Sequence, residues 1–141
     1  MKRQEPYILV ADDDPEDQEL LAERFQRRNP DVHFRLMANG YEVLDYLRSC
    51  STDDLPKLMV IDYKMPGMTG AEVLQNIRHE ERLQHIPKVV WSTSTNREYI
   101  DKALNSGADK YFAKPADMRS FDQLVGELSQ LYRSGKKADN D

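Results

Sequence analysis

Short apolar runs alternate with longer amphipathic segments along this chain. Residues 58–61 are four apolar residues in a row, which is typical of a strand buried on both faces. Residues 7–11 form a second continuous run, and two further strands are expected at 88–92 and 111–113. Residues 32–36 alternate apolar and polar side chains, which predicts a strand with one wetter face.

A segment with apolar residues at helical spacing follows each expected strand. The first such helix should begin at Pro15, with Asp14 as its N-cap. The spacing of Thr69–Glu72 and Thr95–Glu98 predicts capping boxes at two later helix starts. Five strand–helix units in succession require parallel strands, right-handed crossovers and helices on both faces of the sheet.

The length of the chain, 141 residues, favours a single domain. We expect that domain to span residues 6–133, followed by a polar and disordered tail at 134–141. A formal net charge of −5 argues against a general binder of nucleic acid or of anionic membranes. The lone Cys50 permits no internal disulfide, and we find no signal peptide or membrane-spanning segment, so a cytoplasmic location is expected.

Chemically active side chains follow four of the expected strands. In a parallel sheet the carboxyl ends of all strands lie on one edge, where open α/β sheets bind their ligands. That edge should bring together the following residues: Asp12, Asp13, Asp62, Ser92 and Lys114. Each pair of carboxylates about 4 Å apart would cost on the order of 4 kcal/mol at an effective dielectric constant near 20, so the cluster requires a cation or raised pKa values.

Oxygen ligands without histidine or cysteine suit Mg²⁺. A cation, the Lys114 ammonium and the Ser92 hydroxyl together match the oxygens of a phosphoryl group, and Asp62 could then be a nucleophile that forms an acyl phosphate. Each group also has a plain structural interpretation, such as helix capping for Asp12 and Asp13 or a solvated loop position for Lys114. The inference depends on all five groups meeting at one edge.

The ordered combination of motifs resembles the receiver domain of bacterial two-component response regulators. The matching segments are 8–15, 61–70, 90–94 and 107–115, and the likeness extends from Tyr7 to Tyr132. This resemblance implies a flavodoxin-like, doubly wound (βα)₅ sandwich with a five-stranded parallel sheet of order 2-1-3-4-5. It also implies a phosphoacceptor switch that catalyses only its own phosphorylation and dephosphorylation.

The resemblance further assigns a role to each site residue. Asp62 would be the phosphoacceptor, and Mg²⁺ or another divalent cation such as Mn²⁺ would complete the site. The protein ligands of the cation would be Asp13, Asp62, the main-chain oxygen of Lys64 and, through water, Asp12. Around the phosphoryl group the resemblance implies contacts from Ser92 and Lys114, a switch role for Tyr111, and a cis peptide bond before Pro115.

Partners are likewise implied by the resemblance. The phosphoryl donor would be a sensor histidine kinase or a phosphotransfer protein, and the face made by the fourth helix, fifth strand and fifth helix would bind a partner or form a homodimer. The charged segment from His79 to His85, the long loop before Leu58 and the absence of an output domain resemble, more narrowly, stand-alone regulators paired with cyanobacterial-type phytochrome kinases.

Three other functions compete with this interpretation. A haloacid-dehalogenase-type phosphatase needs a second carboxylate two residues after its nucleophile, whereas Asp62 is followed by Tyr63 and Lys64. A flavin-binding flavodoxin would need a phosphate loop where this chain has acids. The main alternative is a phosphorylation-independent pseudo-receiver, an interaction module, against which the complete set of acids and lysine argues.

Overall fold

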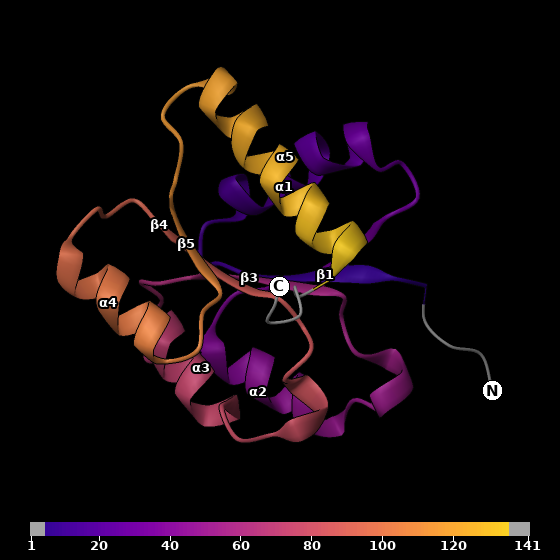
Figure 1. The fold of residues 1–141 in the computed structure, drawn as a ribbon, viewed down its shortest axis with the longest axis vertical. Helices are drawn as coiled ribbons and strands as arrows, with labels where there is room; N and C mark the ends of the chain where they lie inside the picture. The colour runs from indigo at the N-terminus through magenta and orange to yellow at the C-terminus, as the bar shows by residue number, and fades with distance from the viewer. Residues whose placement is uncertain (1–4, 136–141) are drawn as a thin grey trace.

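A computed structural model describes residues 5–135, in which five parallel strands form one sheet. The strand order is β2-β1-β3-β4-β5 (Figure 1), which confirms the predicted doubly wound, flavodoxin-like (βα)₅ arrangement. The strands are β1 (Tyr7–Ala11), β2 (His33–Met37), β3 (Leu58–Asp62), β4 (Lys88–Ser92) and β5 (Lys110–Ala113). All residues of the three inner strands are buried, as their apolar runs predict.

Helices cover both faces of this sheet (Figure 1). One layer contains α1 (Pro15–Arg28) and α5 (Met118–Ser134), which pack against each other. The opposite layer contains α2 (Gly40–Ser49), α3 (Gly70–Ile77) and α4 (Arg97–Asn105), and short 3₁₀ turns lie at Thr52–Asp54 and Glu81–Leu83. Alternate side chains of the inner strands point into these two layers and produce two separate hydrophobic cores.

Local sequence determines where the helices begin. The Asp14 carboxylate accepts a hydrogen bond from the Glu16 amide, and the Thr69–Glu72 capping box is complete, as predicted. The capping box predicted at Thr95 is wrong, because the N-cap of α4 lies one residue later. Asn96 is the N-cap instead, because its side-chain oxygen accepts from the Glu98 amide at 2.8 Å, and asparagine is the stronger capping residue.

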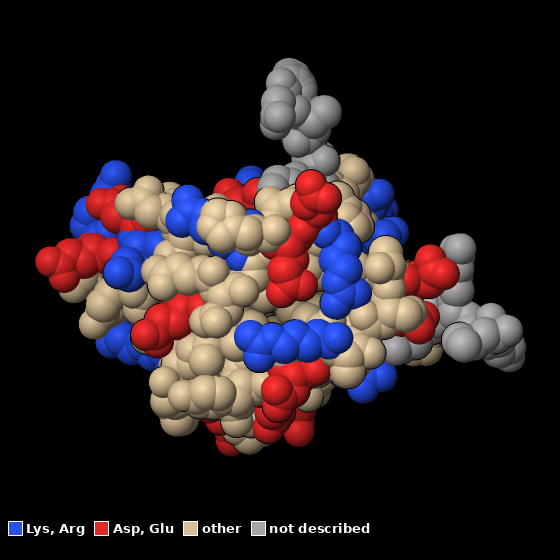
Figure 2. Space-filling model, turned by 90° about the horizontal axis from the view of Figure 1, so that it is seen from below, with Lys and Arg blue, Asp and Glu red and all other residues tan. Residues whose placement is uncertain are grey.

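The charged segment after α3 is attached to the core. The Arg82 guanidinium donates to the main-chain oxygens of Cys50, at 2.7 Å, and Leu47, so it binds carbonyl groups at the end of α2. On the face that carries α2 and α3, acidic and basic side chains are interspersed (Figure 2). That face therefore has no broad basic surface of the kind that binds nucleic acid.

The last helix and the described region end at nearly the same position. Helix α5 continues to Ser134, one residue beyond the expected boundary, and residues 136–141 of the expected disordered tail lie outside the described residues. Within residues 5–135, no helix is both long enough and apolar enough to cross a membrane.

Candidate phosphoacceptor site

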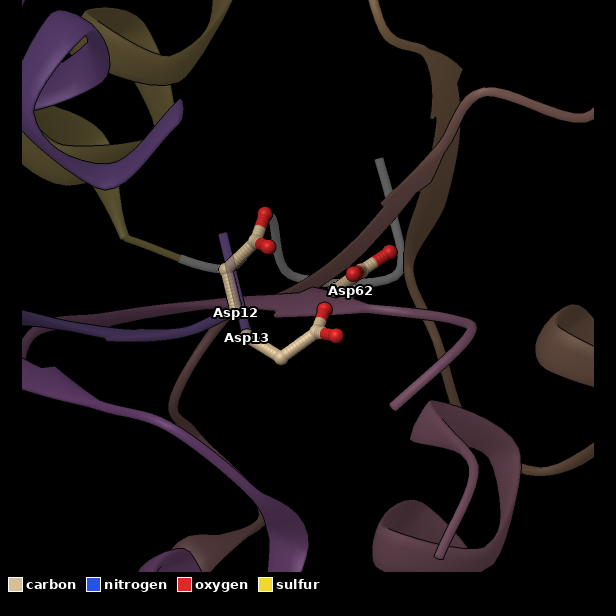
Figure 3. Close-up of side chains that lie close together, drawn as sticks. All are labelled: Asp12, Asp13 and Asp62. Carbon is tan, nitrogen blue, oxygen red and sulfur yellow. The ribbon is translucent and has the colours of Figure 1, made fainter. Parts of the chain in front are cut away.

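Three carboxylates meet at the carboxyl edge of the sheet. Asp12 and Asp13 follow β1 and Asp62 ends β3, so the pairing of these adjacent parallel strands places their side chains together. One oxygen of each lies within 4.8 Å of the others. Figure 3 shows the carboxylate of Asp13 directed toward Asp62. Asp12 and Asp62 are buried, whereas Asp13 is exposed, so the cluster opens to solvent on one side.

A buried glutamine connects the chain at the ends of β1 and β2. Gln18, on α1, donates from Nε2 to the main-chain oxygens of Asp12, at 2.9 Å, and Met37, at 2.7 Å. The Asp12 amide also donates to the Met37 oxygen, and Asp12 Oδ1 accepts from the Asp14 amide. These bonds join the ends of β1 and β2 and fix the orientation of the Asp12 carboxylate.

The backbone of α3 approaches the end of β3 closely, next to Asp62. The Gly70 amide, at the start of α3, donates to the Tyr63 oxygen at 2.8 Å. A Cβ atom on Gly70 would lie 2.6 Å from the main-chain oxygen of Asp62, closer than real Cβ atoms come. Glycine at this position therefore allows α3 to begin directly against the end of β3.

Lys114 supplies the positive charge. Its Nζ lies 2.9 Å from Asp12 Oδ2, 2.8 Å from Asp17 Oδ2 and 3.6 Å from Asp62 Oδ2. The same ammonium lies 4.9 Å from the centroid of the Trp91 ring. Its main-chain amide donates to the Ser92 oxygen at 2.7 Å, which anchors the residue to the end of β4.

Burial and neighbouring charges shift the pKa values of this cluster. Burial, then the Asp12 carboxylate, raises the pKa of Asp62 to about 7, although Lys114 lowers it. Burial also raises the pKa of Asp12, and the Lys114 ammonium offsets only part of that effect. Burial lowers the pKa of Lys114, but the Asp12 and Asp17 carboxylates outweigh it, so that pKa lies above its usual value. Burial therefore disfavours the ionised forms of Asp12 and Asp62, and Lys114 offsets this effect only in part.

Ser92 and Tyr111 are joined through the segment after β4. Ser92 is buried, and its hydroxyl oxygen accepts from the Ser94 amide at 3.1 Å. The Tyr111 hydroxyl donates to the Ser94 main-chain oxygen at 2.7 Å. A displacement of Ser92 would therefore reach β5 through one intervening residue.

Lys64 and Pro115 are the remaining residues of the expected site. Lys64 directs its ammonium over the Tyr99 ring, 4.9 Å from the centroid, and Tyr99 stacks on Tyr63. The expected cis peptide bond between Lys114 and Pro115 is wrong, because no peptide bond within residues 5–135 is cis. The trans isomer is the ordinary preference of a bond before proline, and the Lys114 side chain reaches the carboxylates from it.

Two contributors were not predicted from the sequence. Asp17 and Gln18 are adjacent on the first turns of α1, where polar residues are normally solvated, yet one binds Lys114 and the other is buried. No local sequence pattern distinguishes Asp17 from its exposed neighbour Glu16 on the same helix turn.

The donor set defines the class of site. Three carboxylates without histidine or cysteine fit a hard divalent cation such as Mg²⁺, and burial, which disfavours the ionised forms, raises the pKa values of Asp12 and Asp62. A doubly wound parallel sheet that carries this acidic cluster and a lysine at its carboxyl edge is suited to binding a cation and an oxyanion there.

The sequence profile of the family described as "Response regulator receiver domain" matches residues 8–126, so the chain belongs to the receiver domains of two-component response regulators. Such a domain is a phosphoacceptor switch in a phosphorelay rather than an enzyme acting on a separate substrate.

Individual relatives agree with this assignment. The chain is 32% identical over 123 residues to the two-component response regulator ORR12 of Oryza sativa subsp. japonica, covering 87% of this chain and 98% of that protein. It is similar in structure to the phosphorylated cyanobacterial phytochrome response regulator RcpA, with a TM-score of 0.82, 26% identity and coverage of 93% and 96%. The fold is also shared with the Mn²⁺-bound response regulator Rcp1, with a TM-score of 0.78, 22% identity and coverage of 91% and 94%.

Proposed function

We propose that Asp62 accepts the phosphoryl group and that the surrounding residues bind, neutralise and report it. The observation that carries this proposal is the convergence of Asp12, Asp13, Asp62 and Lys114 at the end of β3. Of the three carboxylates, Asp62 lies on the central strand and its Oδ2 is 3.6 Å from the ammonium. A phosphoryl group attached to Asp62 would bring its oxygens next to that ammonium.

Asp13, Asp62 and the main-chain oxygen of Lys64 would hold Mg²⁺ or Mn²⁺, with Asp12 contributing through water. When bound, the cation neutralises charge on the transferring phosphoryl group. The carboxylate donors of this chain suit that role, and the solved structure of Rcp1 contains Mn²⁺. The exposed position of Asp13 leaves one side of the cluster open for the cation and for water ligands.

The chemical step is a displacement at phosphorus. An Asp62 carboxylate oxygen forms the new P–O bond while the P–N bond to the histidine of the donor breaks, and the electron pair of that bond remains on the imidazole, which takes up a proton. The Lys114 ammonium stabilises the negative charge on the equatorial oxygens. Ser92 would donate its hydroxyl proton to a phosphoryl oxygen.

Signal output follows from the contact between Ser92, Ser94 and Tyr111. If the Ser92 hydroxyl turns toward the phosphoryl group, the bond that it accepts from the Ser94 amide is lost, and the Ser94 oxygen moves relative to Tyr111. Phosphorylation then shifts the population between two arrangements of α4, β5 and α5. In the present arrangement Tyr111 packs partly buried against the core that lies beneath α4.

A histidine kinase partner follows from membership of the receiver family. We propose that the direct donor is such a kinase or a phosphotransfer protein, and the likeness to RcpA, a phytochrome response regulator by its description, favours a phytochrome-type kinase. These are cytoplasmic partners, so we place the domain in the cytoplasm.

The acceptor role is tested by incubating the protein with acetyl phosphate and Mg²⁺ and measuring its intact mass. We expect one phosphoryl adduct on the wild type, none on Asp62→Asn, and none on the wild type when EDTA removes the cation. Asp54→Asn is the matched control, because Asp54 lies far from the cluster in the 3₁₀ turn before β3. An undiminished adduct on Asp62→Asn would refute the assignment, and an adduct-free wild type would favour the pseudo-receiver alternative.

The α4, β5 and α5 face is proposed as the output surface, where a partner or a second copy binds. Leu104 on α4 and Met118 on α5 are large hydrophobic residues exposed by 43% and 42%. We expect beryllofluoride with Mg²⁺ to raise the sedimentation coefficient of the wild type and not that of Leu104→Glu. If the sedimentation coefficient of the wild type does not change, self-association is ruled out and the signal must pass to a different protein.

A further inference from the structure

Lys114 makes a contact that the proposed function does not explain. Its ammonium has three N–H donors; it donates a hydrogen bond to Asp17 at 2.8 Å and forms an ion pair with Asp12 at 2.9 Å. Asp62, at 3.6 Å, is beyond hydrogen-bond distance. The ammonium therefore keeps donor capacity for a group that arrives next to Asp62.

The two carboxylates that hold Lys114 differ in what else they do. Asp12 belongs to the cluster that is suited to a cation, and its other oxygen accepts from the Asp14 amide. Asp17 lies outside that cluster, on the first turn of α1. A cation that attracts the Asp12 carboxylate weakens the hold of Asp12 on the lysine, whereas the hold of Asp17 is unaffected.

The surroundings limit where the ammonium can go. The Lys114 side chain is only 11% exposed, and the Trp91 ring lies against it at 4.9 Å. Trp91 is itself buried and packs edge-on against Phe121 of α5. Lysine has four flexible side-chain bonds, so an acceptor on a rigid helix reduces the entropy lost when the ammonium meets the phosphoryl group.

We propose that Asp17 is a positioning residue, which anchors the Lys114 ammonium from α1 so that its free N–H is directed at the phosphoryl group on Asp62. The inference rests on the proposed roles of Asp62 and Lys114. Asp17 touches neither the reacting atoms nor the cation, and it acts only through the lysine. The first turn of α1 is thereby part of the phosphoacceptor site.

A matched control is present one residue earlier. Glu16 is also an acidic residue on the first turn of α1, so Glu16→Gln and Asp17→Asn remove the same charge from the same helix end. Glu16 forms none of the contacts to Lys114. Any effect confined to Asp17 is therefore due to the contact with the lysine.

The test is calorimetric titration of beryllofluoride, which stands in for the phosphoryl group, in the presence of Mg²⁺. We expect Asp17→Ala to weaken binding about tenfold, which corresponds to about 1.4 kcal/mol. Asp17→Asn, which keeps one acceptor oxygen, should lie between Asp17→Ala and the wild type, and Glu16→Gln should match the wild type. Affinity for Mg²⁺ alone should change by less than about threefold, because Asp17 is outside the carboxylate cluster.

A spectroscopic measurement separates anchoring from general stabilisation. In metal-free protein, the ¹⁵N-labelled ammonium of Lys114 should be protected from exchange in the wild type and in Glu16→Gln, and should lose that protection in Asp17→Ala. Unchanged or tighter beryllofluoride binding by Asp17→Ala would overturn the proposal, because Asp17 would then be neutral or a competitor of the phosphoryl group. Failure of the wild type to bind beryllofluoride would instead refute the proposed function.

Discussion

Lys114→Met is expected to lower the free energy of unfolding of the metal-free protein by about 3 kcal/mol, since removing one partner of a buried ion pair leaves the other uncompensated. Asp12, whose side chain is fully buried, would lose its ammonium partner at 2.9 Å. Methionine keeps the length and apolar stem of lysine, so the change isolates the charge. The measurement is urea unfolding in EDTA, followed by circular dichroism.

The same variant should be phosphorylated by acetyl phosphate about 100-fold more slowly, because one preorganised charge that faces the transferring group is gone. Lys110→Met is the matched control. Its ammonium forms an exposed pair with Glu127 at 3.5 Å, and such pairs contribute less than about 1 kcal/mol. Equal losses of stability in the two lysine variants would show that the buried ion pair between Lys114 and Asp12 contributes no more than an exposed one. Added Mg²⁺ should restore part of the stability of Lys114→Met, because the cation neutralises the same carboxylates.

Gly70→Ala is expected to destabilise the protein by about 2–3 kcal/mol, as overpacking commonly does. The added methyl group would lie 2.6 Å from the Asp62 oxygen and 3.2 Å from Ile61 Cγ2, and backbone atoms cannot move aside as a flexible side chain can. The start of α3 must shift away from β3, so the Asp62 carboxylate is displaced as well. We expect a lower urea midpoint together with a weaker affinity for Mg²⁺.

Gly126→Ala tests whether this loss is specific to the position. Gly126 is also helical, but its added methyl group would meet only the end of the Arg28 side chain, at 3.3 Å. Alanine is favoured over glycine inside a helix by about 1 kcal/mol, so this variant should be neutral or more stable. A Gly70→Ala protein as stable as Gly126→Ala would show that α3 is not held in place by this close approach.

The fold was predictable because each element carries its own pattern. The unbroken apolar run of β3 is typical of an inner strand of a parallel sheet, and that topology brings Asp12, Asp62 and Lys114 to one edge. The convergence follows from topology and not from local sequence. For this reason the cluster was found without any knowledge of side-chain conformations.

The predictions from sequence failed where two local arrangements differ little in free energy or where a contact joins distant parts of the chain. Thr95 and Asn96 are both good N-caps, and only the backbone decides which one receives the Glu98 amide. The isomer before Pro115 depends on less than about 1 kcal/mol, so a pattern of residue types is a weak guide to it. Asp17 was missed because a helix residue contacts the site only through a lysine that is 97 positions away in the chain.

Gln18 affects how the acidic cluster is arranged before a cation binds. Because its amide joins the ends of β1 and β2, it holds the backbone of Asp12 at the edge where Asp62 ends β3. Lys114 offsets part of the repulsion between Asp12 and Asp62, and a bound cation would offset more of it. A cation would then meet carboxylates whose backbone is already held in position by an uncharged side chain that is not one of its ligands.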